Sequence, residues 1–147
     1  MPAFKIGSIE TQSPSFKLLR LKKEGGFFKK NKGGLYFLPG QVINIGLFGY
    51  GQRCYPLAFS PYEGRHVEII IPSNDILSQT LQQLGSQETI AISKPIGSGF
   101  PLQDIEHKDV LLIADNSGLG AAISLLAYLE KNRKKFGSIY LVYQAKD

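Results

Sequence analysis

The sequence predicts a mainly β protein, an antiparallel barrel or sandwich followed by one βαβ unit. Short, partly alternating apolar runs with turn residues between them fill most of the first hundred positions. A single short helical pattern interrupts these runs. Beyond Asp109 the apolar runs become continuous and flank a helix rich in Ala and Leu, which is typical of a parallel α/β arrangement.

Turn residues separate the strands that we expect in the first part. The turn signals are Ser13-Pro14-Ser15, Pro39-Gly40, Gly49–Gly51 and Pro61–Gly64. The Lys-rich, glycine-bounded segment Gly25–Gly34 is expected to be a loop or a hairpin end. The expected strands are Phe4–Thr11, Phe16–Lys23, Val42–Phe48, Cys54–Phe59, Val67–Ile71 and Thr89–Lys94.

One helix is expected within this series, over Ile76–Leu84. Its apolar residues Leu77, Leu81 and Leu84 recur at the i, i+4, i+7 spacing of a helix face. Three polar residues just before it, Ser73, Asn74 and Asp75, are all suited to capping its start, and Gly85 can end it.

The last forty residues predict a βαβ unit. The run Val110–Ala114 suits a strand buried on both faces, and the polar turn Asp115–Gly120 leads into a helix over Ala121–Lys131. Gly137 closes the helix, and Ser138–Tyr143 is a second apolar strand. Because one βαβ unit cannot form a full nucleotide-binding sheet, we expect an incomplete α/β domain here.

Length and composition limit the possible classes of protein. A chain of 147 residues, 43% hydrophobic and 20% charged, is long enough to form one domain with a hydrophobic core, or one domain and a fragment. Cys54 is the sole cysteine, which excludes an internal disulfide and a Cys-based zinc or iron–sulfur site. His66 and His107 lie far apart, so we expect no metal site.

The same chain lacks an obvious targeting or membrane segment. Met1–Ile9 is not a charged segment followed by an apolar run, which argues against a signal peptide. The longest nearly apolar stretch, Leu119–Leu129, is shorter than the roughly 20 residues needed to span a bilayer. We therefore expect a cytoplasmic protein without membrane insertion.

The net charge of +5 comes mainly from two segments, Lys17–Lys32 and Lys131–Lys135. Such patches could steer an acidic partner, a phosphate ligand or nucleic acid. We favour the simpler interpretation of a solvated hairpin edge and a helix C-terminus that attracts cations, so nucleic acid is not the expected partner.

Three segments carry chemistry suited to a nucleotide ligand. Arg53 and Tyr55 stand two residues apart on an expected strand and so share a face, where an aromatic ring can stack and an Arg can bind a diphosphate. Gly97 and Gly99 allow a close backbone approach, and Ser78 adds a hydroxyl near a helix N-terminus. Each has a plain alternative: a half-buried strand with a surface Arg, an ordinary turn, and a simple cap.

The order of these segments resembles the ferredoxin–NADP reductase superfamily, in particular its electron-transfer-subunit and flavin-reductase branches. The match covers roughly residues 3–147. The similar segments are Phe37–Val42 (F-x-P-G-Q-[FY] in the family), Arg53–Ser60 (R-x-[YF]-[ST]-[IL]-[AS]-S), Ser78–Leu81 ([ST]-x-x-L) and Pro95–Pro101 (G-P-x-G-x-x-F). Val110–Leu129 is similar to the first strand, turn and helix of the family's nicotinamide domain.

The resemblance implies a six-stranded antiparallel Greek-key barrel over residues 1–104 that binds FAD, or less often FMN. Residues 105–147 would then be a partial NAD(P)-binding βαβ segment. Tyr55 would stack on the flavin ring, Arg53 and Ser78 would hold phosphates, and Leu57, Ala58 and Ser60 would line the flavin with backbone groups. The cofactor-binding set implied is Arg53, Tyr55, Pro56, Leu57, Ala58, Ser60, Ile71, Ser78, Gly97, Gly99, Asn116 and Gly118.

The resemblance also implies a function, a flavin-dependent oxidoreductase or electron-transfer subunit. Electrons would pass between NAD(P)H, the bound flavin and an acceptor such as ferredoxin or an iron–sulfur partner. The flavin supplies the redox chemistry, while the protein supplies orientation and electrostatics, and we assign no catalytic residue.

Two residues depart from the family pattern. Pro56 replaces a Ser or Thr whose hydroxyl usually lies near flavin N5, and Asp115 places a carboxylate where the dinucleotide diphosphate would lie, unless it merely caps the helix. The chain also stops before the later nicotinamide strands, as either a short homologue or a segment of a longer reductase. We therefore expect flavin binding more than reduction by NAD(P)H.

Two further expectations follow from these departures. The exposed strand edge near Ser138–Tyr143 could pair with a second copy to form a homodimer. The alternative function is a non-catalytic interaction module that kept the barrel and lost the cofactor chemistry.

Overall fold

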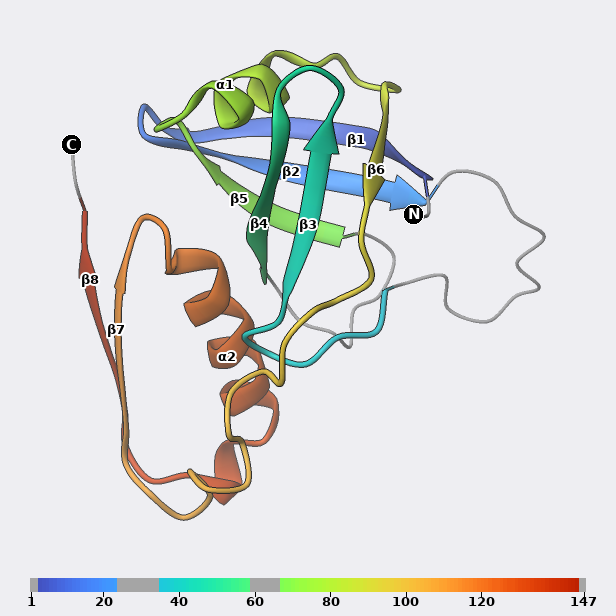
Figure 1. Ribbon diagram of the computed structural model, residues 1–147. Coiled ribbons are helices and arrows are strands. Elements are labelled where there is room, and N and C mark those ends of the chain that lie inside the picture. The colour runs from blue at the N-terminus through green and yellow to red at the C-terminus, as the bar shows by residue number, and fades with distance from the viewer. Residues whose placement is uncertain (1–2, 24–34, 59–66, 146–147) are drawn as a thin grey trace.

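A computed structural model describes residues 3–23, 35–58 and 67–145, and it consists of a β-barrel with a small α/β unit beside it (Figure 1). The barrel elements are β1 (Ala3–Ser13), β2 (Phe16–Lys23), β3 (Val42–Leu47), β4 (Gly51–Ala58), β5 (Val67–Pro72), α1 (Ile76–Gln83) and β6 (Thr89–Ile92). The α/β unit contains β7 (Val110–Asp115), α2 (Leu119–Lys131), the short 3₁₀ helix η1 (Arg133–Lys135) and β8 (Ile139–Gln144).

The six strands β1 to β6 close into an antiparallel barrel in the order β1-β2-β5-β4-β3-β6. Because β2 pairs with β5 rather than with β3, the spatial order departs from the chain order, as in a Greek key. Alternate residues of each strand face inward, and this is why apolar residues at every second position of the sequence predict strands here. The expected mainly β barrel is confirmed.

The barrel interior is filled by aliphatic side chains with one tyrosine among them. Ile6, Leu19, Ile43, Ile45, Leu57, Ile69 and Ile92 have no exposed surface, and Tyr55 has 1%. The helix α1 closes one end of the barrel (Figure 1), because Leu77 and Leu81 insert into the same core. Of the three expected caps, Asp75 is the N-cap: its side chain accepts a hydrogen bond from the Ser78 amide.

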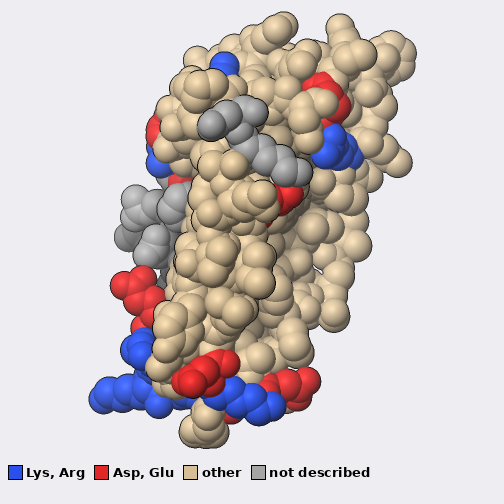
Figure 2. Space-filling view, turned by 90° about the vertical axis from the view of Figure 1, so that its left-hand side faces the viewer, with Lys and Arg blue, Asp and Glu red and all other residues tan. Residues whose placement is uncertain are grey.

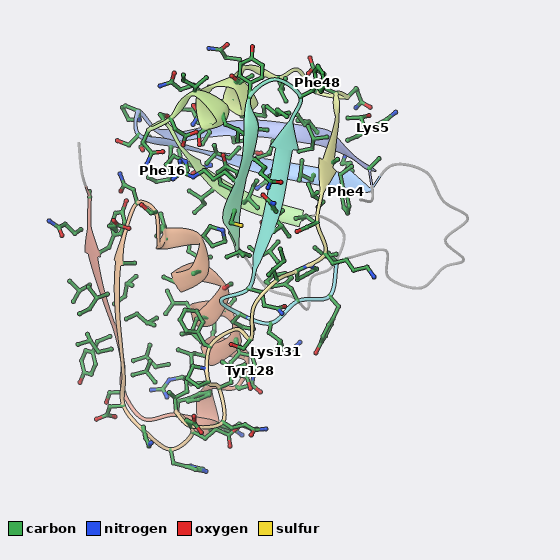
Figure 3. All side chains as sticks on the ribbon, viewed as in Figure 1. Phe4, Lys5, Phe16, Phe48, Tyr128 and Lys131 are labelled. Atoms are coloured by element: carbon green, nitrogen blue, oxygen red, sulfur yellow. The ribbon has the colours of Figure 1, made fainter. Side chains whose placement is uncertain are left out.

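The α/β unit has its own smaller core. β7 and β8 form a two-stranded parallel sheet, and α2 lies between that sheet and the barrel (Figure 1). Val110 and Leu112 of β7 pack with Leu125 and Leu129 of α2 and with Phe136. Tyr128 lies on α2 (Figure 3), where its ring meets that of Phe136 edge to face with centroids 6.2 Å apart.

The helix α2 also joins this unit to the barrel. Leu119 and Ile123 pack on Leu18, Ala58 and Ile70 of the barrel's outer face. The helix comes close to β4 at Gly120, where an added Cβ would lie 3.2 Å from the Pro56 carbonyl oxygen. A glycine at this position therefore lets the helix start lie directly on the barrel.

Several expected boundaries shift by a few residues. β4 begins at Gly51, two residues after Gly49, because that glycine (φ +81°) and Gly51 (φ +87°) complete a tight hairpin turn. β6 ends at Ile92 instead of Lys94, and α1 ends at Gln83 with Leu84 as its C-cap, one residue before Gly85. α2 ends at Lys131 as expected but begins two residues earlier than expected, at Leu119, and Gly137 follows η1 rather than α2. The loop expected at residues 25–34 and the turn expected at 61–64 lie outside the described residues.

One face of the β7–β8 sheet is exposed and apolar. Leu111 pairs with Tyr140 and Ile113 with Val142, and these side chains are 52–75% exposed. Figure 2 views the molecule from this side and shows a mostly uncharged surface, with the largest group of Lys, Arg, Asp and Glu at its lower end and smaller groups near the top. Among the described residues, no helix has the length and apolar character needed to cross a bilayer.

Candidate functional site

Strand β4 is the centre of the candidate site, because its two ends lie against two helix starts. Arg53, near its beginning, reaches the start of α1, where it forms an ion pair with Asp75. Pro56, three residues later, lies against Gly120 in the first turn of α2. A helix start presents free amide groups and a partial positive charge, so β4 connects two places suited to anions.

Four side chains meet at the start of α1, and we call Arg53, Tyr55, Asp75 and Ser78 the Asp75 cluster. One Asp75 oxygen, Oδ1, accepts the Ser78 amide at 2.9 Å, while Oδ2 accepts the Ser78 hydroxyl at 2.8 Å and pairs with the Arg53 guanidinium. The Tyr55 hydroxyl lies 2.9 Å from Ser78 Oγ. Since the one Ser78 hydroxyl proton is given to Asp75, the tyrosine is the donor to Ser78.

The electrostatics of this cluster favour a fixed carboxylate. Partial burial acts to raise the pKa of Asp75, but the hydrogen bonds from the Ser78 amide and hydroxyl and the charge of Arg53 outweigh it, and the pKa lies below its ordinary value of 3.8. Burial is the main cause that raises the pKa of Tyr55. The cluster thus holds one ionised carboxylate and two neutral hydroxyls.

An open pocket of about 490 Å³ lies over the cluster. Arg53 and Asp75 contribute to it, and so do Tyr50 and Ile76, which are 53% and 71% exposed. Phe48, at the tip of the same β3–β4 hairpin, is also fully exposed (Figure 3). Exposed aromatic and aliphatic side chains beside a guanidinium are suited to the flat rings and phosphates of a nucleotide.

Tyr55 does not present its ring to this pocket. The side chain is 1% exposed and belongs to the barrel core, so it offers its hydroxyl to Ser78 rather than a ring face to a ligand. Stacking on a flavin ring, the role that the resemblance implies, would require the ring to leave the core. The sequence could not show this, because the inward or outward direction of β4 depends on its register in the closed barrel.

A second cluster forms where the other end of β4 meets the loop that contains Gly97. The Leu57 amide donates to the Gln41 carbonyl at 3.1 Å, and the Gln41 side-chain amide donates to the Gly97 carbonyl at 2.7 Å. Gln41 was thus missed as a site residue, although it stands in the segment Phe37–Val42 that carries the resemblance. It joins two segments that lie 40 residues apart in the chain.

The two glycines of that loop have different reasons to be glycine. Gly97 (φ +99°) has open space where a Cβ would lie. Gly99 (φ +74°) lies so close to the preceding turn that a Cβ would meet the Pro39 carbonyl oxygen at 2.7 Å. Gly99 therefore serves the packing of the loop, and Gly97 leaves the surface beside Gln41 open.

The remaining predicted residues that the structure describes lie on two barrel strands and just before α2. Ala58 is buried beneath α2, and Ile71 is in the barrel core with its carbonyl accepting from Gln82 at 2.9 Å. At the start of α2, Gly118 is the N-cap, and Asn116 accepts a hydrogen bond from Tyr143. Ser60 lies outside the described residues.

Asp115 is held within the turn that precedes α2. Its Oδ1 accepts the amides of Ser117 and Gly118 at 2.9 and 3.0 Å. The N-cap of α2 is Gly118 and has no side-chain cap hydrogen bond, so the expectation that Asp115 caps the helix is wrong: its carboxylate stabilises the turn instead. Among the described residues, no group of His, Cys, Asp and Glu side chains is arranged to hold a metal ion.

Comparison with known structures identifies the fold. The chain has the fold of ferredoxin–NADP⁺ reductase and related reductases, as the resemblance implied. Phthalate dioxygenase reductase, described as a modular structure for electron transfer from pyridine nucleotides to [2Fe-2S], superposes with a TM-score of 0.78 and 19% identity over 99% of this chain and 44% of that one. The ferredoxin–NADP⁺ reductase of Neisseria gonorrhoeae, solved with FAD and NADP, gives 0.74 and 18% over 96% and 56%.

In sequence the chain is similar to the gamma subunit of sulfhydrogenase 1 of Pyrococcus furiosus. The two are 29% identical over 110 residues, which is 75% of this chain and 38% of that subunit. The chain therefore spans well under half the length of that curated relative. No protein-family model matches the chain.

Proposed function

We propose that this chain is a flavin-nucleotide-binding electron-transfer unit, with FAD as the expected cofactor and FMN as the alternative. The observation that carries the proposal is strand β4, which connects a guanidinium and a helix start at one end with a second helix start at the other. The fold, shared with a ferredoxin–NADP⁺ reductase solved with FAD, and the similarity to a sulfhydrogenase gamma subunit support the same role.

The residues at the start of α1 fit the phosphate part of such a cofactor. Arg53 and Ser78 already hold an oxyanion, the Asp75 carboxylate, so their donors suit a phosphate oxygen in geometry and charge. In the proposal they hold a flavin phosphate, and Tyr55 supports Ser78 through its hydroxyl. When bound, the flavin would supply the electron-transfer chemistry.

The other residues of the proposed flavin site lie along the barrel wall. Pro56 sits where α2 meets β4, and Gly97 lies beside the Gln41 side chain. The backbone of Leu57, Ala58 and Ser60 would line the flavin, with Ile71 and Gly99 supporting the wall. These roles are part of the proposal.

The electron partners are proposed at the level of their class. Residues 1–104 would hold the flavin, and residues 105–147 would contribute Asn116 and Gly118 to part of a nicotinamide site. Because Asp115 occupies the amides of that turn, NAD(P)H is the less favoured donor, and an electron-transfer protein such as ferredoxin or an iron–sulfur subunit is the favoured partner.

The test is the visible spectrum of the purified protein after incubation with FAD and, separately, with FMN. The expected result is flavin absorbance that remains with the protein through gel filtration, with the released flavin identified after denaturation. Arg53→Ala should weaken flavin binding at least about tenfold, since it removes a charge-assisted hydrogen bond to phosphate.

Arg20→Ala is the matched control for this experiment. Arg20 is also a partly exposed barrel arginine paired with carboxylates, Glu10 and Glu68, but it lies on β2 and does not line the pocket. Its variant should bind flavin like the wild type. A folded protein that stays colourless after incubation with both flavins would contradict the proposal.

The second candidate is an interaction module that has lost its cofactor. Two observations favour it: the Tyr55 ring is buried, and the Asp75 carboxylate fills the place of a phosphate. Its binding surface would be the exposed apolar face of Leu111, Ile113, Tyr140 and Val142, with a second copy or an electron-transfer subunit as the partner. A partner interaction that survives Arg53→Ala, in a protein that never binds flavin, would favour this function.

A further inference from the structure

The carboxylate of Asp75 occupies the donors that the proposed function assigns to a phosphate at the start of α1, those of Arg53 and Ser78. It accepts the Ser78 amide and the Ser78 hydroxyl, and it neutralises the Arg53 guanidinium. In the part of the chain that the structure describes, Arg53 has no ion pair other than this one. The carboxylate thus behaves as a bound anion that the chain itself supplies.

The position of Asp75 makes this occupancy reversible. Its side chain is 29% exposed and lies on the wall of the pocket that also contains Tyr50 and Ile76, so it can turn toward solvent without crossing the barrel core. The two Ser78 donors that it covers, the backbone amide and the hydroxyl, are fixed in place. Ser78 has no exposed surface, and its hydroxyl is held by the buried hydroxyl of Tyr55.

We propose that Asp75 is an internal competitor for the flavin phosphate, so that a flavin binds only when its phosphate displaces this carboxylate from Arg53 and Ser78. The inference rests on the proposed function, because it concerns the same phosphate position. It assigns to Asp75 a role in setting affinity rather than in binding the cofactor.

The physical argument is a balance of charge. A phosphate placed on Arg53 while Asp75 stays there would bring two anions within hydrogen-bond range of one guanidinium, where like charges repel strongly. With the carboxylate turned away, the phosphate gains the Arg53 and Ser78 donors but the capping bond of α1 is lost. Either route weakens flavin binding relative to a chain with a neutral residue at position 75.

The decisive variant is Asp75→Asn. Asparagine is as good an N-cap as aspartate, so the α1 start keeps an oxygen acceptor for the Ser78 amide while the charge is removed. The affinity for FAD and FMN, measured by titration calorimetry, should rise about tenfold or more. Asp75→Ser, another favoured cap, gives the same test should the Asn variant fail to fold.

Asp115→Asn is the matched control. It removes one negative charge from the same chain and changes the residue that accepts the amides of the turn before α2, but Asp115 does not pair with Arg53. If net charge alone governed flavin affinity, both variants would bind flavin more tightly by the same factor. The inference requires that Asp75→Asn raises the affinity and that Asp115→Asn leaves it nearly unchanged.

A second probe separates this inference from the proposed function. Pyrophosphate is titrated against each variant while the Ser78 amide resonance is followed by NMR, and Asp75→Asn should bind it about tenfold more tightly than the wild type. If no variant binds a flavin but this difference is seen, the flavin function fails and the role of Asp75 stands. Two outcomes would overturn the role of Asp75. In the first, the wild type binds flavin, and Asp75→Asn binds flavin and pyrophosphate no more tightly than the wild type does. In the second, no variant binds flavin or pyrophosphate.

Discussion

In the described part of the chain, α1 and α2 each follow an aspartate whose carboxylate accepts amide protons, but the two carboxylates have different roles. Asp75 caps α1 by accepting the Ser78 amide, whereas Asp115 accepts the amides of Ser117 and Gly118 in the turn before α2, a helix without a side-chain cap. Behind Asp75 stand a guanidinium and two buried hydroxyls that are anchored in the barrel core. Asp115 accepts from the amides of an exposed turn.

This difference teaches that a cap and an anion site are separate properties of a helix start. Stabilising a helix start or a turn needs only a carboxylate placed to accept backbone amides, and both aspartates satisfy that requirement. An anion site also needs a cation and donors that remain when the carboxylate leaves. At α1, Arg53 supplies the charge and the fully buried Ser78 supplies the fixed donors. Three predictions test this comparison.

The largest effect is expected from Tyr55→Ala, which removes the aromatic side chain that fixes the α1 start to the barrel core. Because Tyr55 is 1% exposed, the cavity and the lost hydrogen bond should reduce the free energy of unfolding by about 3–5 kcal/mol. Urea denaturation measures the loss. Tyr50→Ala, in the turn just before the same strand, should change stability by less than about 0.5 kcal/mol because Tyr50 is 53% exposed. Equal losses would contradict the assignment of Tyr55 to the core.

A smaller effect is expected from Ser78→Ala. It leaves the buried Tyr55 hydroxyl without its acceptor and removes one donor from Asp75, so the loss should be about 1–3 kcal/mol. The matched change at the other helix start is Ser117→Ala, whose side chain is exposed, and it should cost less than about 0.5 kcal/mol. Thermal unfolding of the two variants side by side makes the comparison, and a greater loss from Ser117→Ala would reverse it.

The smallest effect is expected from Asp75→Asn, on the way the free energy of unfolding falls at acid pH. The pKa of Asp75 is lower in the folded chain than its ordinary value of 3.8, so ionised Asp75 stabilises the fold above that value, and this contribution is lost as the pH falls through the lower, folded pKa. Asp75→Asn should therefore flatten the fall in stability below about pH 4. Urea midpoints measured from pH 7 down to the acid transition test this. If the urea midpoints of Asp75→Asn fell with pH as steeply as those of the wild type, the Asp75 carboxylate would not be held by Ser78 and Arg53 as the structure has it.

Much of the architecture could be predicted from the sequence because it depends on local patterns. The period-two runs gave six strands, the Leu77–Leu81 spacing gave α1, and β7, α2 and β8 followed from their apolar runs. Strand ends were less certain, since the hairpin at Gly49 and Gly51 depends on positive φ angles.

The candidate site could be predicted only in part. Arg53 and Ser78 were expected near a phosphate, and the structure brings them together through Asp75. The direction of the Tyr55 ring and the pairing of Arg53 with Asp75 were not predictable, because both depend on contacts across the closed barrel between positions up to 23 residues apart. Gln41 could have been recognised, since it lies in a segment that already carried the resemblance.

The contact between Gly120 and Pro56 has a consequence for how this sequence can change over evolution. A side chain at position 120 would press on the carbonyl of β4, so any larger residue there requires the strand to shift or the helix to tilt. A shift of β4 would carry Arg53 with it. We therefore expect positions 53, 56 and 120 to vary as a group in related sequences, whereas Gly97, with open space around it, is restrained by its backbone angle alone.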